Sequence, residues 1–186
     1  MVGGEAKVEP KTETQPSAET LDTRLDDPSG YASYHRDDEW HNDICEQYDR
    51  SVNAMIDTCS SSGVPLVLVK LGANLRDCPP FKSEHSTELS VNDEQQWQVL
   101  FDEATFLDKT DPEAALTVYL QALQLDDAYP LLHFRIARCY DFLAKFEEAK
   151  THYQSALNLD VCPLRMCEEI ADSLARIALQ KNVPLV

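Results

Sequence analysis

The sequence predicts a mostly α-helical protein, in which two helical hairpins and a capping helix adjoin a small α/β unit. Three observations predict it. Apolar residues recur at spacings of three and four over several long segments. Small and aromatic residues return at a fixed interval within residues 91–161. The run Val64–Val69 is apolar on both faces, as in a buried parallel strand. Its first four residues, Val-Pro-Leu-Val, occur again at Val183–Val186.

The interval in residues 91–161 is 34 positions, which separates Tyr119 from Tyr153. Three other pairs share this spacing: Ala115 and Ala149, Ala122 and Ala156, and Leu125 and Leu159. Small residues let two antiparallel helices approach closely, and an aromatic ring fills the gap beside them. The predicted packing positions are Ala104, Ala115, Tyr119, Ala122, Ala137, Tyr140, Ala149, Tyr153 and Ala156. The pattern resembles two tetratricopeptide repeats, at about 92–127 and 130–161.

The rest of the chain divides around these repeats. Residues 1–30 are polar and charged with few large apolar side chains, which predicts a disordered tail. Residues 31–90 predict a helix, a strand at 64–70 and a long loop, and residues 162–186 predict a helix and the start of a second strand. Because two repeats leave apolar faces uncovered, we expect the helix in 162–186 to cap them. Exposed strand edges would favour self-association.

Composition excludes several classes of function. Sixteen basic and thirty-three acidic residues give a formal net charge of -17, which argues against nucleic-acid binding. The sequence has no apolar run long enough to span a membrane, and the polar N-terminus predicts a cytoplasmic protein. The six cysteines form no Cys-x-x-Cys pair, so we expect reduced, buried thiols and neither metal nor cofactor.

A second resemblance rests on motifs outside the repeats. They are Gly63–Val69, the loop Asn74–Phe81 with Ser83 and His85, the segment Leu159–Arg165 and the repeated Val-Pro-Leu-Val. From about Tyr31 onward the chain resembles bacterial SGNH (GDSL-type) hydrolase-like proteins with inserted tetratricopeptide repeats. The residues of the loop that carry this likeness are Asn74, Arg76, Asp77, Pro80, Phe81 and His85.

The resemblance implies an ester hydrolase with a Ser on a Gly-Asp-Ser turn and a C-terminal Asp-x-x-His base. Neither block stands where that pattern needs it, so the sequence looks like a middle portion of the fold, and an incomplete reading frame is one explanation. We assign no catalytic residue. Three partial matches have simpler interpretations: Gly72–Asn74 as a turn rather than an oxyanion block, Asp38–His41 as a helix start, and Ser83 with His85 as a pair in which His85 is structural or solvated.

The function that remains is protein interaction. The first helix of the second repeat carries Phe134, Arg135 and Arg138 at positions that face a peptide groove in such repeats. The arginines could bind an acidic peptide end, or they could pair with neighbouring carboxylates of the chain itself. The alternative function is an ester hydrolase whose catalytic blocks lie outside this sequence.

Overall fold

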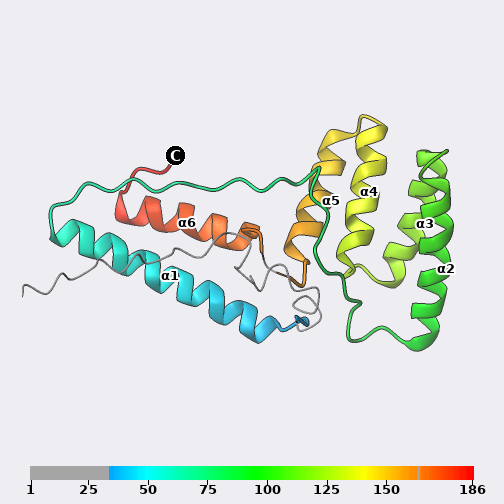
Figure 1. Cartoon of the computed structure of the whole chain (residues 1–186), viewed down its shortest axis with the longest axis horizontal. Helices are drawn as coiled ribbons and strands as arrows, with labels where there is room; N and C mark the ends of the chain where they lie inside the picture. Colours follow the sequence, from blue (N-terminus) through cyan, green and yellow to red (C-terminus); the bar gives the residue numbers. More distant parts are fainter. Residues whose placement is uncertain (1–33, 163) are drawn as a thin grey trace, which may run out of the picture. The chain divides into compact units, whose positions relative to one another are not determined.

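The computed structural model describes residues 34–162 and 164–186, so the predicted tail at 1–30 lies outside the described residues. Residues Tyr34–Val186 form one compact unit. Its helices are α1 (Asp38–Ser61), α2 (Val91–Leu107), α3 (Pro112–Leu125), α4 (Pro130–Phe142), α5 (Phe146–Asn158) and α6 (Glu168–Lys181) (Figure 1). The prediction of a mostly helical protein is confirmed. None of these helices is long and apolar enough to cross a lipid bilayer.

The first hairpin joins α2 and α3 through a short turn. The Ser90 side chain caps α2 by accepting the Asp93 N–H, and the Asp111 side chain caps α3 by accepting the Ala114 N–H, with Pro112 in the first helical turn. The contact between the helices buries residues of both: Trp97, Ala104, Ala115, Tyr119 and Ala122. The small residues of α2 and α3 therefore lie where the two helices meet.

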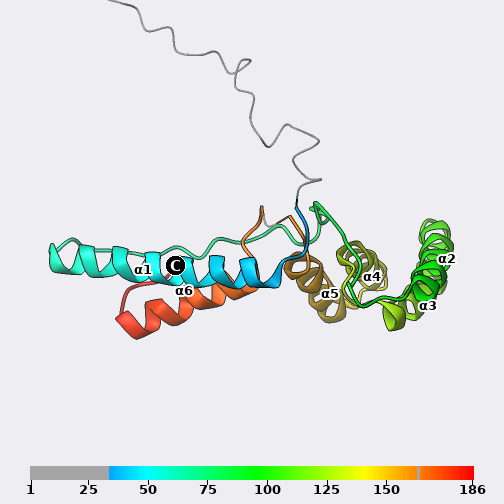
Figure 2. The ribbon, with the colours of Figure 1, turned by 90° about the horizontal axis from the view of Figure 1, so that it is seen from below.

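The second hairpin joins α4 and α5, and α4 also packs against α3 (Figure 2). Its core consists of Phe134, Ala137, Ala149, Tyr153 and Ala156. The turn between the two helices has Ala144 at a φ of 57°, in the left-handed region. The Lys145 N–H donates to the Tyr140 carbonyl and the Ala144 N–H to the Asp141 carbonyl, which is the Schellman arrangement at a helix end.

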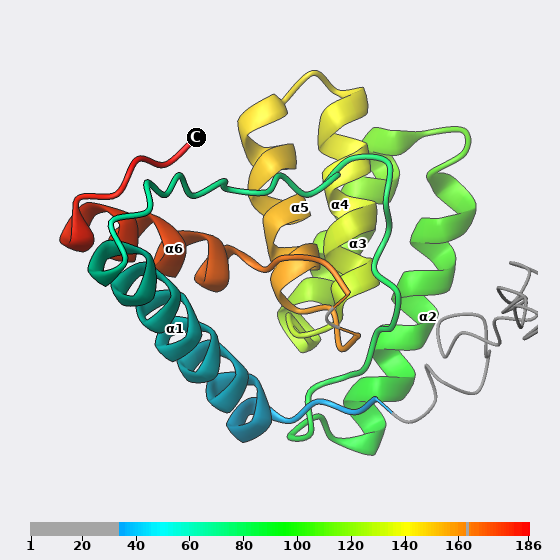
Figure 3. The same ribbon diagram turned by 60° about the vertical axis from the view of Figure 1, so that its left-hand side comes forward.

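The segments outside the hairpins meet through α1 and α6, which lie side by side (Figure 3). Val52 and Ile56 of α1 pack against Leu174 and Ile177 of α6. The segments that follow the two helices cover this contact with partly buried side chains: Leu66, Leu68, Val183 and Leu185. This part of the chain thus consists of two helices, α1 and α6, each followed by an extended segment.

The predicted strands at 64–70 and 183–186 are largely wrong. Within the described residues the two segments are joined by a single isolated parallel bridge, between Leu68 and Leu185. Neither segment extends this bridge into a strand of several residues. The Leu68 N–H donates to the Pro184 carbonyl, and the Val186 N–H donates to the Leu68 carbonyl. Prolines in both segments lack an N–H, and each segment has one neighbour, so the ladder stays short. A sheet of an SGNH-like α/β unit is therefore not found in this part of the chain.

The role expected of the last helix also needs correction. Its apolar face does not cap the repeats, because Leu174 and Ile177 pack on α1. Its contact with α5 is polar: the Glu168 carboxylate accepts hydrogen bonds from the Gln154 and Asn158 side chains. The apolar spacing of a helix indicates that one face is buried, but it does not tell which partner buries it.

Candidate functional site

A groove runs along the exposed side of α4. One part is a cavity of about 310 Å³ lined by Asp108, Lys109, Pro112, Arg135, Arg138, Cys139 and Phe142. A second cavity of about 270 Å³ is lined by Arg76, Asp77, Arg138, Asp141, Phe142 and Tyr153. Because the two cavities share Arg138 and Phe142, they form one continuous surface, which we call the α4 groove.

Arg135 lies in the groove and is held by the first hairpin. Its Nη1 atom lies 3.2 Å from Asp108 Oδ2. The Tyr119 hydroxyl donates to the same carboxylate oxygen at 3.1 Å and also lies 3.1 Å from the Thr105 hydroxyl. Burial raises the pKa of Tyr119 above its ordinary value, so the phenol keeps its proton and acts as a donor. The repeat tyrosine thereby fixes Asp108, and Asp108 fixes Arg135.

Arg138, one turn further along α4, is exposed and forms no ion pair or side-chain hydrogen bond with the residues that the structure describes. Its neighbour Arg76 differs, because the Arg76 Nε atom lies 2.6 Å from Asp141 Oδ2. Phe142 borders both cavities with 74% of its surface exposed. The groove thus combines an unpaired guanidinium with an exposed aromatic ring.

Phe134, which the sequence predicts beside the two arginines, does not line the groove. Its side chain is buried in the core of the second hairpin, with its ring 5.5 Å from that of Tyr153 in an edge-to-face contact. Sequence reasoning missed Lys109 and Phe142, and it named Arg76 only as a loop residue. The loop Asn74–Phe81 offered a signal for Arg76, because the apolar Leu75 beside it suggests that the loop is anchored on another part of the protein. Leu75 does pack against the second hairpin.

The loop that carries the SGNH resemblance is held by Arg165. The Arg165 guanidinium donates to the carbonyl oxygens of Cys78 at 2.8 Å and Asn74 at 3.4 Å, and it lies 5.5 Å from the centre of the Phe81 ring. It also pairs with Asp160 at 3.1 Å. The Asp160 carboxylate accepts the Phe81 N–H at 2.9 Å. The two motifs, distant in sequence, are therefore two sides of one packed junction.

The other residues of that loop have local roles. The Asn74 side chain accepts the Asp77 N–H at 3.0 Å, which makes a turn rather than an oxyanion site. Pro80 is half-buried directly before Phe81. His85 contacts the rings of both Trp97 and Tyr129, which also contact each other, and its Nδ1 atom is 2.7 Å from Asp126 Oδ2.

Three arrangements could suggest catalysis. The Ser83 hydroxyl accepts the Leu131 N–H at the start of α4, so it is not paired with His85. Asp38–His41 begins α1, where the Asp37 side chain accepts the Trp40 N–H. Cys45 lies 3.7 Å from His41, but burial and the nearby Glu169 and Cys167 raise the pKa of its thiol to about 11. Such a thiol is a poor nucleophile near neutral pH.

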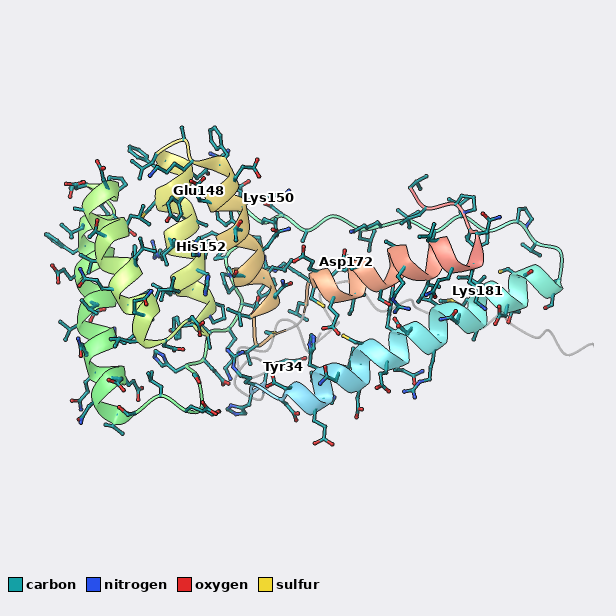
Figure 4. The ribbon with its side chains drawn as sticks, turned by 180° about the vertical axis from the view of Figure 1, so that it is seen from behind. Tyr34, Glu148, Lys150, His152, Asp172 and Lys181 are labelled. Atoms are coloured by element: carbon teal, nitrogen blue, oxygen red, sulfur yellow. The ribbon has the colours of Figure 1, made fainter. Side chains whose placement is uncertain are left out.

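A histidine pair, which does not line the groove, connects α4 and α5 of the second hairpin. His133 Nδ1 lies 3.1 Å from His152 Nδ1, and His133 Nε2 lies 2.7 Å from the Asp127 carbonyl. His152 is labelled in Figure 4. The ring of Tyr140 stacks on His152 at 5.6 Å. Burial and His133 lower the pKa of His152 to about 4. His152 is therefore neutral at physiological pH, and it contributes packing rather than charge.

Part of the chain, the hairpin of α4 and α5, matches the model of a known repeat family. A tetratricopeptide repeat occupies residues 131–160. The family model covers α4, α5 and their connecting turn, and it does not extend over α2 and α3. No curated protein and no solved structure matches the chain. None of these comparisons connects the chain with SGNH hydrolases. Repeats of this family usually mediate protein–protein interaction.

Proposed function

We propose that the chain is a protein-interaction module, and that its α4 groove binds an acidic segment of a partner protein. The observation that carries the proposal is Arg138, an exposed guanidinium without a partner among the described residues, beside the exposed ring of Phe142. A guanidinium binds a carboxylate through two parallel hydrogen bonds, so it selects acidic residues with defined geometry.

The charge around the groove supports an acidic ligand. The chain as a whole carries a formal net charge of -17. The groove has the opposite tendency, because it is lined by four cationic residues, Arg76, Lys109, Arg135 and Arg138, and by three acidic ones, Asp77, Asp108 and Asp141. Asp141 pairs with Arg76 and Asp108 with Arg135, which leaves the two cations Lys109 and Arg138 against the single carboxylate of Asp77, so the groove keeps an excess of one positive charge. An acidic peptide would be repelled by most of this protein's surface and attracted here.

The ligand we expect is an extended peptide with an acidic residue next to a large apolar residue. The acidic side chain would pair with Arg138, and the apolar side chain would pack on Phe142. An ionic hydrogen-bonded contact of this kind contributes about 1.5 kcal/mol, so its loss should weaken binding roughly tenfold. Arg135 is less suitable for mutation, because its replacement would also leave Asp108 without its cation.

The test is a random peptide display selection on the folded chain, followed by affinity measurement for the enriched peptides. We expect enriched peptides to contain Asp or Glu, and Arg138→Glu to weaken their binding tenfold or more. Arg50→Glu is the matched control, because Arg50 is an exposed α1 residue far from the groove in sequence. If Arg138→Glu and Arg50→Glu have equal effects, or if no peptide is enriched, the proposal is wrong.

We also propose that this part of the chain acts by binding rather than by catalysis, in a protein related to the SGNH hydrolase-like group. The parallel bridge between Leu68 and Leu185 supports an arrangement in which the repeats are inserted between two segments that each consist of a helix and an extended stretch. Ester turnover by the purified chain that disappears in Ser83→Ala would overturn the non-catalytic assignment. Self-association remains a prediction, supported by the exposed side chains of Val67, Val69 and Val186 beside the bridge.

A further inference from the structure

We propose that His41, Cys45 and Cys167 form a binding site for a transition-metal ion, with Zn²⁺ as the natural ligand and Glu169 as the fourth donor. The ligand atoms of the first three residues all lie within 4.8 Å of one another. The site lies where the first turns of α1 and α6 meet, away from the α4 groove, and it is independent of the function proposed above.

Two of the donors come from one face of α1. His41 and Cys45 are four residues apart, so their side chains project from the same side of the helix. The His41 Nε2 atom lies 3.7 Å from the Cys45 Sγ atom. Zinc–nitrogen and zinc–sulfur bonds of about 2.0 and 2.3 Å in a tetrahedron place two such ligand atoms about 3.5 Å apart. The α1 pair therefore already has nearly the spacing of two zinc ligands.

The third donor comes from the start of α6. Cys167 occupies the N-cap position, where a side chain normally accepts a backbone N–H, yet the Cys167 side chain forms no capping hydrogen bond. Its sulfur is directed to the α1 pair instead. The N–H groups at a helix N-terminus also favour an anionic ligand such as a thiolate.

Glu169 is the candidate for the fourth donor because it contacts His41, and it lies outside the group of three residues whose ligand atoms are all within 4.8 Å of one another. Its Oε2 atom lies 3.2 Å from Nε2 of His41, the same nitrogen that faces Cys45. The carboxylate is thus on the side of the ring where an ion would bind, and it is not behind the ring as an outer hydrogen-bond acceptor would be. One nitrogen, two sulfurs and a carboxylate oxygen form a donor set that suits Zn²⁺ and disfavours Mg²⁺ or Ca²⁺.

Bound Zn²⁺ would tie together the ends of α1 and α6 that lack apolar packing. The buried contacts between these helices, Val52 and Ile56 with Leu174 and Ile177, lie two or more turns further along each helix. At the N-terminal ends the helices share polar groups and a cavity lined by both. An ion there would fix the segment that connects the second hairpin to α6.

The test is titration of the reduced full chain with Co²⁺, which reports thiolate ligands and tetrahedral geometry through its absorption, followed by displacement with Zn²⁺. We expect sulfur-to-cobalt charge-transfer bands that Zn²⁺ abolishes. Cys45→Ser and Cys167→Ser should each weaken the affinity for Zn²⁺ at least about 100-fold, more than the loss of an outer-shell partner would. His41→Gln should shift the visible bands as well as weaken binding.

Cys59→Ser is the matched control, because Cys59 is also a partly buried α1 cysteine but is absent from the cluster. It should leave the Co²⁺ spectrum unchanged, and circular dichroism should show that every variant keeps its helices. Absence of charge-transfer bands in the wild-type chain, or unchanged band intensity and unchanged affinity in Cys45→Ser and Cys167→Ser, would overturn the site. Unchanged Zn²⁺ affinity in Glu169→Gln would remove Glu169 as the fourth donor.

Discussion

Mild acid should destabilise the second hairpin through one histidine. His152 has a pKa of about 4 in the folded chain, against an ordinary value of 6.5, because it is buried and faces His133. Between these two values the unfolded chain binds a proton at His152 that the folded chain does not bind. The free energy of unfolding therefore falls as the pH is lowered from 6.5 towards 4.

The size of the effect follows from the two pKa values. One unit of pKa difference corresponds to about 1.4 kcal/mol, and pH 5 lies one and a half units below the ordinary pKa of His152. A fully effective shift would lower the free energy of unfolding by about 2 kcal/mol between pH 7 and pH 5. Since His152 is only partly buried, we expect about 1 kcal/mol.

The assay is urea denaturation at pH 7 and pH 5, followed by circular dichroism, on the wild-type chain and on His152→Gln. Glutamine does not titrate, and its amide N–H can still donate to His133. The other titrating groups are common to both proteins, so their contribution cancels in the comparison. We expect the wild-type chain to lose about 1 kcal/mol more than the variant. An equal loss in both proteins would refute the role of His152.

Two further substitutions test the turn and the junction. Ala144→Gly should stabilise the chain by about 0.5 kcal/mol, because Ala144 has a φ of 57° and glycine adopts that conformation without strain. A lower urea midpoint for this variant would contradict the assignment. Asp160→Asn should destabilise the chain by about 3 kcal/mol, because it leaves the largely buried Arg165 without its anion. Faster amide exchange at Phe81 should accompany the loss, and unchanged exchange there would count against the junction.

The helical hairpins could be predicted because the residues that make their contacts recur at regular intervals in the sequence. Ala115 and Tyr119 are both fully buried, and each lies where only a small residue or a ring of that shape fits between two helices. A residue's helical face is fixed by its neighbours in sequence, so the period alone was enough to propose these positions. Phe134 shows the limit, since its position left open whether the ring lines a groove or enters the core.

Features that depend on distant partners could not be predicted in this way. The run Val64–Val69 has apolar residues on both faces, but the sequence does not tell how many strands pair with it, and Val67 and Val69 remain exposed. The cluster of His41, Cys45 and Cys167 could not be predicted for the same reason, because it also depends on a distant part of the chain. Its spacing to Cys45 is visible on one helix, whereas Cys167 joins the pair only because α6 packs on α1.

The bridge between Leu68 and Leu185 has a consequence for the order in which the protein forms on the ribosome. Both hairpins consist of contacts between neighbours in sequence, so each can fold as soon as it emerges. The apolar face of α1 is synthesised before them and must wait for Ile177 and Leu185 before it is covered. During that interval Val52 and Ile56 are exposed to other nascent chains, which makes α1 the segment that a chaperone would protect.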